Sequence, residues 1–120
     1  MKRSRYGEVT SFTTKDGSSI RELMHPSVHG NINQSFAEAT VQPGQTTQLH
    51  RHRTSEEIYH VTAGEGVMTL AAETFPIAVG DTVLIPPGTP HCVENTGKGV
   101  LTILCACSPA YSHDDTDILT

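Results

Sequence analysis

Turn-forming residues divide this chain at short, regular intervals. They stand at Asp16-Gly17, Pro26, Gly30-Asn31, Pro43-Gly44, Gly64, Gly66, Gly80-Asp81, Pro86-Pro87-Gly88 and Gly97-Lys98-Gly99. Apolar residues rarely recur at helical spacing before one of these turns interrupts them. Segments of strand length between turns are typical of an all-β sandwich or barrel. We therefore expect no long helix, and strands at residues 19–23, 35–41, 46–52, 57–62, 66–71, 74–79, 82–85, 91–94 and 100–107.

Length and charge narrow the classes of protein further. The 120 residues suit one domain, and no internal repeat or low-complexity linker divides them, so we expect a single domain over residues 1–120. Thirteen acidic and eight basic residues give a net charge of -5, which disfavours nucleic acid as a partner. No apolar run is long enough to cross a membrane, and no apolar stretch of a secretory signal follows the basic residues 1–5. We expect a cytoplasmic protein with free thiols at Cys92, Cys105 and Cys107.

Four residues have the chemistry and spacing of a metal site. His50 and His52 stand two residues apart, so in a strand both imidazoles point to the same face. Glu57 follows after a stretch short enough for a turn, so the next strand could bring its carboxylate to that face. His91 follows the stiff, proline-rich turn at residues 86–90. Three imidazoles and one carboxylate suit one divalent Fe, Mn, Ni, Cu or Zn ion, with two octahedral positions left for substrate or dioxygen.

The spacing around these residues resembles the two sequence motifs of the cupin superfamily. The first motif, at residues 44–64, consists of Gly44, His50, His52, Glu57 and Gly64. The second, at residues 80–95, consists of Gly80, Pro86, Gly88, His91 and Asn95. Residues 19–23 and 107–116 also look like the small single-domain microbial cupins called mannose-6-phosphate isomerase-like.

The resemblance implies an antiparallel double-sheet barrel, the jelly roll of RmlC-like cupins. It implies that His50, His52, Glu57 and His91 bind one divalent transition metal per chain. Glu56 is the alternative carboxylate, but the six residues between Glu57 and Gly64 match the motif. Residues 1–34 would form an N-terminal strand arm, and residues 108–120 a tail that lies over the barrel or frays.

Strand alternation predicts which residues surround the metal. If His50 and His52 point inward, so does Gln48; Glu57 brings Tyr59 and Val61 with it, and His91 brings Val93. The predicted substrate pocket is therefore Gln48, Tyr59, Val61 and Val93, with Glu57 and Tyr59 as candidate catalytic residues, although Tyr59 could also be a core aromatic residue. No Arg or Lys is expected to face inward, which disfavours a phosphosugar substrate unless Arg21 folds over the mouth.

These residues leave the function open between classes. In the first, the protein is a metalloenzyme of the dioxygenase, isomerase, lyase or decarboxylase type. Its small organic substrate would be oriented by Tyr59, with Glu57 or a bound water moving a proton. In the second, it is a non-catalytic small-ligand-binding or sensor barrel, and in the third a structural barrel. The enzyme is favoured because cupin sensors usually carry a DNA-binding domain, for which 120 residues leave no room. We also expect a homodimer, in which the strand at residues 19–23 pairs with a neighbour's sheet edge.

Overall fold

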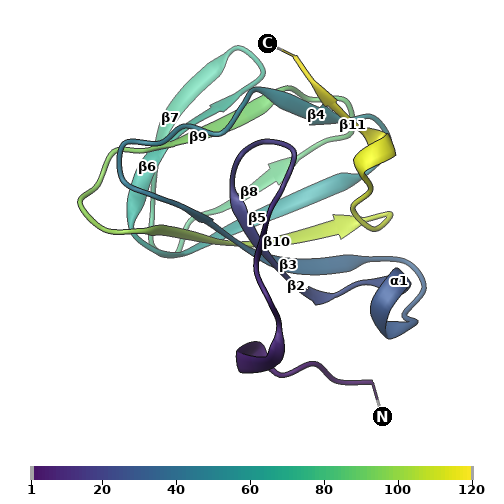
Figure 1. Ribbon diagram of the computed structural model, residues 1–120. Coiled ribbons are helices and arrows are strands. Elements are labelled where there is room, and N and C mark those ends of the chain that lie inside the picture. Colours follow the sequence, from purple (N-terminus) through teal and green to yellow (C-terminus); the bar gives the residue numbers. More distant parts are fainter. Residues whose placement is uncertain (1, 120) are drawn as a thin grey trace.

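The computed structural model describes residues 2–119, which form two antiparallel sheets (Figure 1). The strands are β1 (Phe12–Thr13), β2 (Ser19–Met24), β3 (Ser35–Val41), β4 (His50–His52), β5 (Glu56–Ala63), β6 (Glu65–Leu70), β7 (Glu73–Ala78), β8 (Thr82–Ile85), β9 (His91–Asn95), β10 (Leu101–Ser108) and β11 (Thr116–Ile118). Sheet A has six strands in the order β1-β2-β3-β10-β5-β8, and sheet B has five in the order β11-β4-β9-β6-β7. The predicted double-sheet jelly roll is confirmed, but its two sheets are separate ladders that do not close on each other.

Helical structure is confined to short turns. The one α-helix assigned within residues 2–119 is α1 (Pro26–His29), and 3-10 turns lie at Tyr6–Glu8 and His113–Asp115. His25 caps α1 by accepting a hydrogen bond from the Ser27 amide, and Gly30 ends it in the left-handed conformation. No helix in the described part of the chain is long and apolar enough to cross a membrane.

Alternation along the central strands builds the interior between the sheets. In β10 every second residue is buried, from Leu101 through Ile103 and Cys105 to Cys107. Their neighbours face outward, as expected for a sheet with one covered face. Five apolar side chains are less than 2% exposed and form the centre of the core: Val61, Met68, Ile85, Leu101 and Ile103. Burial of each contributes about 1.5–3 kcal/mol to the stability of the fold.

Gly64 marks a close approach between β5 and β10. Its φ is +82°, and an added Cβ would lie 2.7 Å from the Val100 carbonyl oxygen. Any larger residue here would have to push β10 away, so glycine at the end of the first motif is a packing requirement.

One predicted strand is shorter than expected, and this changes which residues face inward. Residues 46–49 are not in a ladder apart from a single bridge between Thr46 and Glu94, and β4 begins only at His50. Thr47 is buried and Gln48 is exposed. Alternation counted backward from His50 therefore fails, and the placement of Gln48 in the pocket is wrong.

Both flanking segments join the sheets. The N-terminal strand β2 pairs with β3 of its own chain, with Ile20 opposite Ala39, so it is not the free strand that we expected to pair with a neighbour. The C-terminal strand β11 pairs with β4, and Thr116 lies opposite His52. The tail thus lies over the jelly roll beside the first motif.

Candidate metal centre

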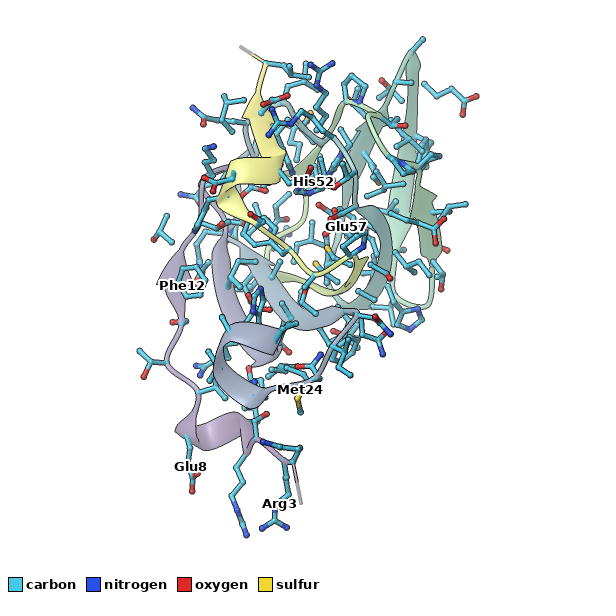
Figure 2. All side chains as sticks on the ribbon, turned by 90° about the vertical axis from the view of Figure 1, so that its right-hand side faces the viewer. Arg3, Glu8, Phe12, Met24, His52 and Glu57 are labelled. Atoms are coloured by element: carbon cyan, nitrogen blue, oxygen red, sulfur yellow. The ribbon has the colours of Figure 1, made fainter. Side chains whose placement is uncertain are left out.

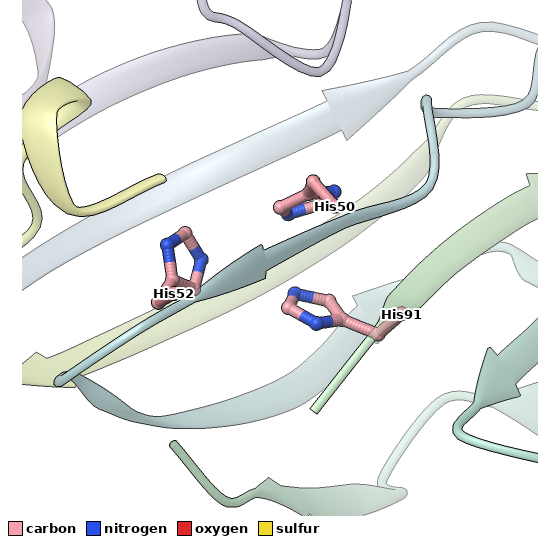
Figure 3. A group of neighbouring side chains, drawn as sticks. All are labelled: His50, His52 and His91. Atoms are coloured by element: carbon pink, nitrogen blue, oxygen red, sulfur yellow. The ribbon is translucent and has the colours of Figure 1, made fainter. Parts of the chain in front are cut away.

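Three histidines of sheet B converge in the interior. His50 and His52 lie on β4, and His50 is directly opposite His91 on β9. One ring nitrogen of each imidazole lies within 4.8 Å of the other two (Figure 3). All three side chains are buried, at 3%, 4% and 0% exposure.

Glu57 reaches the same cluster from the opposite sheet. Its Oε1 lies 3.1 Å from Nε2 of His52 and 3.4 Å from Nε2 of His91, and Figure 2 shows Glu57 beside His52 in the interior. Two adjacent ligands of an octahedral ion with bonds of about 2.1 Å lie about 3.0 Å apart. The separations of Glu57 from His52 and His91 are therefore close to those of neighbouring metal ligands.

Hydrogen bonds at the other ring nitrogens set the direction of each imidazole. Nδ1 of His50 donates to the Gln48 carbonyl oxygen at 2.7 Å, and Nδ1 of His91 donates to the Thr89 carbonyl oxygen at 2.9 Å. Nδ1 of His52 lies 2.9 Å from Oγ1 of Thr116, whose own hydroxyl donates to the Ser112 carbonyl oxygen. With Nδ1 protonated, each neutral ring presents the lone pair of Nε2 to the centre, as in a metal-binding histidine.

Two buried atoms at the centre lack any hydrogen-bond partner. They are Oε1 of Glu57 and Nε2 of His91. The two atoms lie 3.4 Å apart, but they do not form a hydrogen bond with each other. Buried polar atoms are normally paired. A divalent cation between them would satisfy both atoms, so the nitrogen and oxygen donors present here fit a transition metal.

Comparison with known families agrees with this geometry. The family described as a cupin domain matches residues 37–107, which include all four predicted ligands. The chain belongs to the cupin family.

Several relatives and solved structures resemble this cupin. It is 51% identical to an uncharacterized protein of Methanocaldococcus jannaschii over 98% of this chain and 94% of the relative. It is 36% identical to an oxalate-binding protein of Thermotoga maritima over 70% of this chain and 65% of that protein. Among solved structures, a predicted oxalate decarboxylase of T. maritima matches with a TM-score of 0.76 and 29% identity, over 88% of this chain and 96% of the other.

A similarity of fold alone extends to the polyketide cyclase RemF of Streptomyces resistomycificus. Its TM-score is 0.83 at 21% identity, with 100% of this chain and 86% of the cyclase covered. Proteins named for different activities thus share this jelly roll, so the chemistry of this chain must be argued from its own side chains.

Electrostatics keep the central carboxylate of the cupin ionised. Burial alone would raise the pKa of Glu57, but the ring nitrogens of His52 and His91 beside its carboxylate outweigh burial and lower this pKa to about 2. Burial lowers the pKa of His52, yet Glu57 more than compensates, so the net shift is upward. The pKa of His50 is lowered, first by burial and then by nearby His91. An ionised carboxylate beside imidazole lone pairs favours a bound cation.

A cavity opens beside three of the four predicted ligands, His50, His52 and Glu57, with an empty volume of ≈ 550 Å³ that is partly open to solvent. Tyr59 lines it, and its ring lies edge-on to His91 with the centroids 5.8 Å apart. Val61 and Val93, which alternation placed in the pocket, lie deeper, in the apolar core. Exposed Gln48 lies outside the cavity, and its carbonyl oxygen supports His50.

The cavity wall carries acidic side chains but no lysine or arginine. Asp16, Glu22 and Glu57 contribute carboxylates. Arg21 does not fold over the mouth, because its guanidinium lies 4.7 Å from the ring centroid of Tyr6. Arg51 is paired with Asp117 on the outside.

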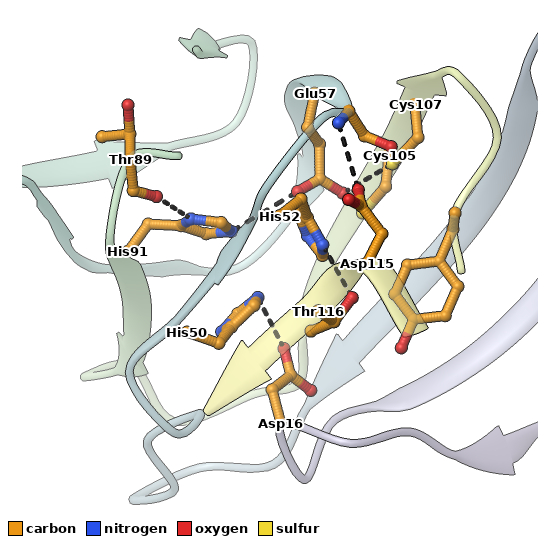
Figure 4. Close-up of polar contacts among 12 residues, drawn as sticks. Asp16, His50, His52, Glu57, Thr89, His91, Cys105, Cys107, Asp115 and Thr116 are labelled. Atoms are coloured by element: carbon orange, nitrogen blue, oxygen red, sulfur yellow. Dashed lines mark hydrogen bonds and ion pairs between the residues drawn. The ribbon is translucent and has the colours of Figure 1, made fainter. Parts of the chain in front are cut away.

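Residues that sequence reasoning missed come from the two flanking segments, which we call the rim (residues 12–18 and 111–116). Asp16 of the rim faces His50, and Thr116 supports His52 (Figure 4). Tyr111 lines the cavity, and its hydroxyl lies 3.1 Å from that of Thr14 across the rim. Lys15 also donates to the Thr116 carbonyl oxygen at 2.8 Å. The one signal for this part was the resemblance at residues 107–116, which assigned no role to Thr116.

Proposed function

We propose that this cupin holds one divalent transition metal with His50, His52, Glu57 and His91, and that it is a metalloenzyme for a small organic substrate. The observation that carries the proposal is the convergence of three buried imidazoles, each with a hydrogen bond at Nδ1, with Nε2 of His52 and His91 facing the buried carboxylate of Glu57. When bound, Fe, Mn, Ni, Cu or Zn would polarise an oxygen atom of the substrate. The reaction would be of the decarboxylase, lyase, isomerase or dioxygenase type.

The side chains around the metal have separable roles in this proposal. A carboxyl group with a pKa of about 2 is a weak base, so Glu57 serves mainly to hold the cation. The thiol of Cys107 donates to Oε2 of Glu57 at 3.2 Å, which leaves Oε1 directed at His52 and His91. Burial raises the pKa of Tyr59, so its phenol stays protonated and can donate a hydrogen bond to a substrate oxygen.

The relatives support chemistry on small oxygen-containing molecules, but the cavity limits which ones. They include an oxalate-binding protein and a predicted oxalate decarboxylase, both of T. maritima. A phosphosugar or another strongly anionic substrate would need Arg or Lys at the wall, and the wall has neither. We therefore do not propose sugar-phosphate isomerisation.

One observation favours the alternative, a non-catalytic small-ligand or sensor barrel. The chain is 35% identical over 90 residues to the transcriptional regulator PuuR of Escherichia coli, and it spans 47% of that protein. A segment similar to this cupin can therefore form part of a transcriptional regulator. A sensor would bind its ligand without consuming it.

Metal analysis followed by a turnover screen tests the proposal. Elemental analysis of purified protein should give one transition metal per chain, and His50→Ala, His52→Ala, Glu57→Gln and His91→Ala should each lower metal content. Small hydroxylated and carbonyl compounds would then be screened in air and under anaerobic conditions. Turnover that depends on metal identifies the enzyme, whereas saturable binding without turnover favours the sensor. Unchanged metal content in all four variants would refute the site.

We also propose a homodimer, on a different ground from that of the sequence. A row of apolar residues crosses the outer face of sheet A, where Ala106 pairs with Phe36 on one side and Ile58 on the other, and Ile58 pairs with Leu84. Phe36, Ile58 and Leu84 are 40%, 41% and 53% exposed. A second copy would bury this row. Light scattering should give a dimer mass that Ile58→Lys reduces to a monomer mass.

The chain is further proposed to act as one cupin domain in the cytoplasm. Cys92, Cys105 and Cys107 are free thiols, which suits a reducing compartment. Cell fractionation, with a tag attached at the N-terminus, tests this placement.

A further inference from the structure

Asp16 is a buried carboxylate that the four-residue metal site does not use. It stands in the turn between β1 and β2 and is 8% exposed. Its Oδ1 accepts hydrogen bonds from the backbone amide and the hydroxyl of Ser18, at 2.9 and 2.6 Å. The backbone carbonyl oxygen of Asp16 accepts a hydrogen bond from the Gln48 amide at 2.8 Å. This bond holds the turn beside the segment that precedes His50.

The second oxygen of Asp16 faces a metal-ligand nitrogen. Oδ2 lies 3.6 Å from Nε2 of His50 (Figure 4). With Nδ1 of His50 donating to the Gln48 carbonyl oxygen, Nε2 of the neutral ring carries a lone pair that faces a carboxylate oxygen. The separation is too long for a hydrogen bond. It is similar to the 3.4 Å between Glu57 and His91, so Asp16 stands toward His50 as Glu57 stands toward His91.

We propose that Asp16 is a second carboxylate ligand of the metal and that it selects against dianionic substrates. This inference rests on the proposed metal centre. Two carboxylates neutralise a divalent ion, whereas Glu57 alone would leave one positive charge. Five protein ligands leave one position of an octahedral shell, and a chelating dianion such as oxalate needs two. The cavity wall offers no Lys or Arg to compensate. The site therefore takes a neutral molecule through one hydroxyl or carbonyl oxygen.

Asp16→Asn is the informative variant, because the amide keeps an oxygen that can accept from Ser18 and removes the charge. The matched control is Asp81→Asn, since exposed Asp81 is likewise next to a turn glycine and accepts a backbone hydrogen bond, from the Ala78 amide at 2.8 Å. Full-length protein would be stripped of metal and titrated with Co²⁺ against a chelator. We expect Asp16→Asn to weaken Co²⁺ binding by about 10–100-fold and to change the visible spectrum of bound Co²⁺, and Asp81→Asn to do neither.

The first arm of a second measurement uses wild-type protein alone, so it can be read even if the variant fails to fold. Oxalate, added at millimolar concentration to Co²⁺-loaded wild-type protein, should leave the Co²⁺ spectrum unchanged, whereas the same addition to Asp16→Asn should shift it. Oxalate binding by the wild type at that concentration would overturn the proposal. So would unchanged affinity in Asp16→Asn, or weaker binding with an unchanged spectrum, since the latter places Asp16 outside the coordination shell. If wild-type protein takes up no metal, the proposed function itself fails; if it takes up metal that Asp16→Asn binds equally well, only the role of Asp16 is refuted.

Discussion

The interior between the sheets has a polar end, at the three histidines and Glu57, and an apolar end, at the hydrophobic core. The same strands form both ends, but the ends differ in function. Along β5 the inward residues run from Glu57 through Tyr59 to Val61, and along β9 they run from His91 to Val93. Each strand therefore begins at the candidate metal centre and continues into the apolar core, and β9 ends beyond it at the buried polar Asn95. The backbone pattern is the same at both ends, and only the side chains change. The candidate chemistry and the apolar packing are therefore carried by different residues of the same strands.

The two ends should also differ in how they affect stability. The apolar end contributes free energy through burial alone. The polar end buries several ionisable side chains and leaves Oε1 of Glu57 and Nε2 of His91 unpaired, which costs free energy until a cation binds. Substitutions at the two ends should therefore separate stability from metal binding.

The largest effect is expected at the apolar end. Leu101 is fully buried, so Leu101→Ala should lower the free energy of unfolding by about 2–5 kcal/mol through lost burial and a residual cavity. Chemical denaturation of metal-free protein measures this, with Ile32→Ala, at an 86% exposed position outside the proposed dimer face, as the control. The folded variant should still bind one metal. Loss of metal binding in folded Leu101→Ala would mean that the two ends are not independent.

At the polar end, His91→Ala should weaken metal binding strongly and change stability little, the reverse of Leu101→Ala. If about 10–16 kcal/mol of metal-binding free energy is shared among four ligands, one ligand is worth about 3 kcal/mol, or about 100-fold in affinity. The stability of the metal-free protein should change much less than in Leu101→Ala. His60→Ala is the control, because His60 faces outward and contacts Thr82. Equal metal affinity in the two variants would contradict the assignment of His91.

Acid should destabilise the metal-free protein through Glu57. The folded-state pKa of about 2 is below the ordinary value of 4.5, so the contribution of Glu57 is complete above pH 4.5 and is lost as the pH falls toward 2. Between pH 5 and pH 3 the loss should be about 2 kcal/mol. Denaturation curves of Glu57→Gln should have a shallower pH dependence over this range; an equally steep one would show that other groups dominate.

A smaller effect on metal affinity should follow from removing the hydrogen bond that orients His52. Thr116→Val keeps the shape of the side chain but removes the oxygen that accepts from Nδ1 of His52, so metal affinity should fall by about 10-fold. Thr82→Val is the matched control, since its hydroxyl meets Nδ1 of His60 on the outer face. Calorimetric titration with Zn²⁺ would compare the two, and a similar fall in both would show a general effect of losing threonine.

Local patterns explain how much of this structure could be predicted. The strand at residues 35–41 was predicted with its observed bounds, because alternation and turn residues act within a few positions. The stretch 46–49 departs from alternation because it lies outside a regular ladder. The three-residue strand β11 is too short to show a period, and it exists through its pairing with distant β4. Asp16 approaches His50 through the same kind of long-range contact, which no spacing in the sequence indicates.

The rim lies outside the segment that carries the two motifs. Residues 12–18 precede that segment and residues 111–116 follow it, yet the two meet over the cavity through Thr14 and Tyr111. Such a rim could be exchanged between homologous proteins by grafting only its two flanking segments. The stretch of chain from β3 to β10 would then stay as it is. Laboratory recombination could then assemble new specificities at the edges of the gene, with Asp16 and Thr116 exchanged along with the rim while His50, His52, Glu57 and His91 are kept.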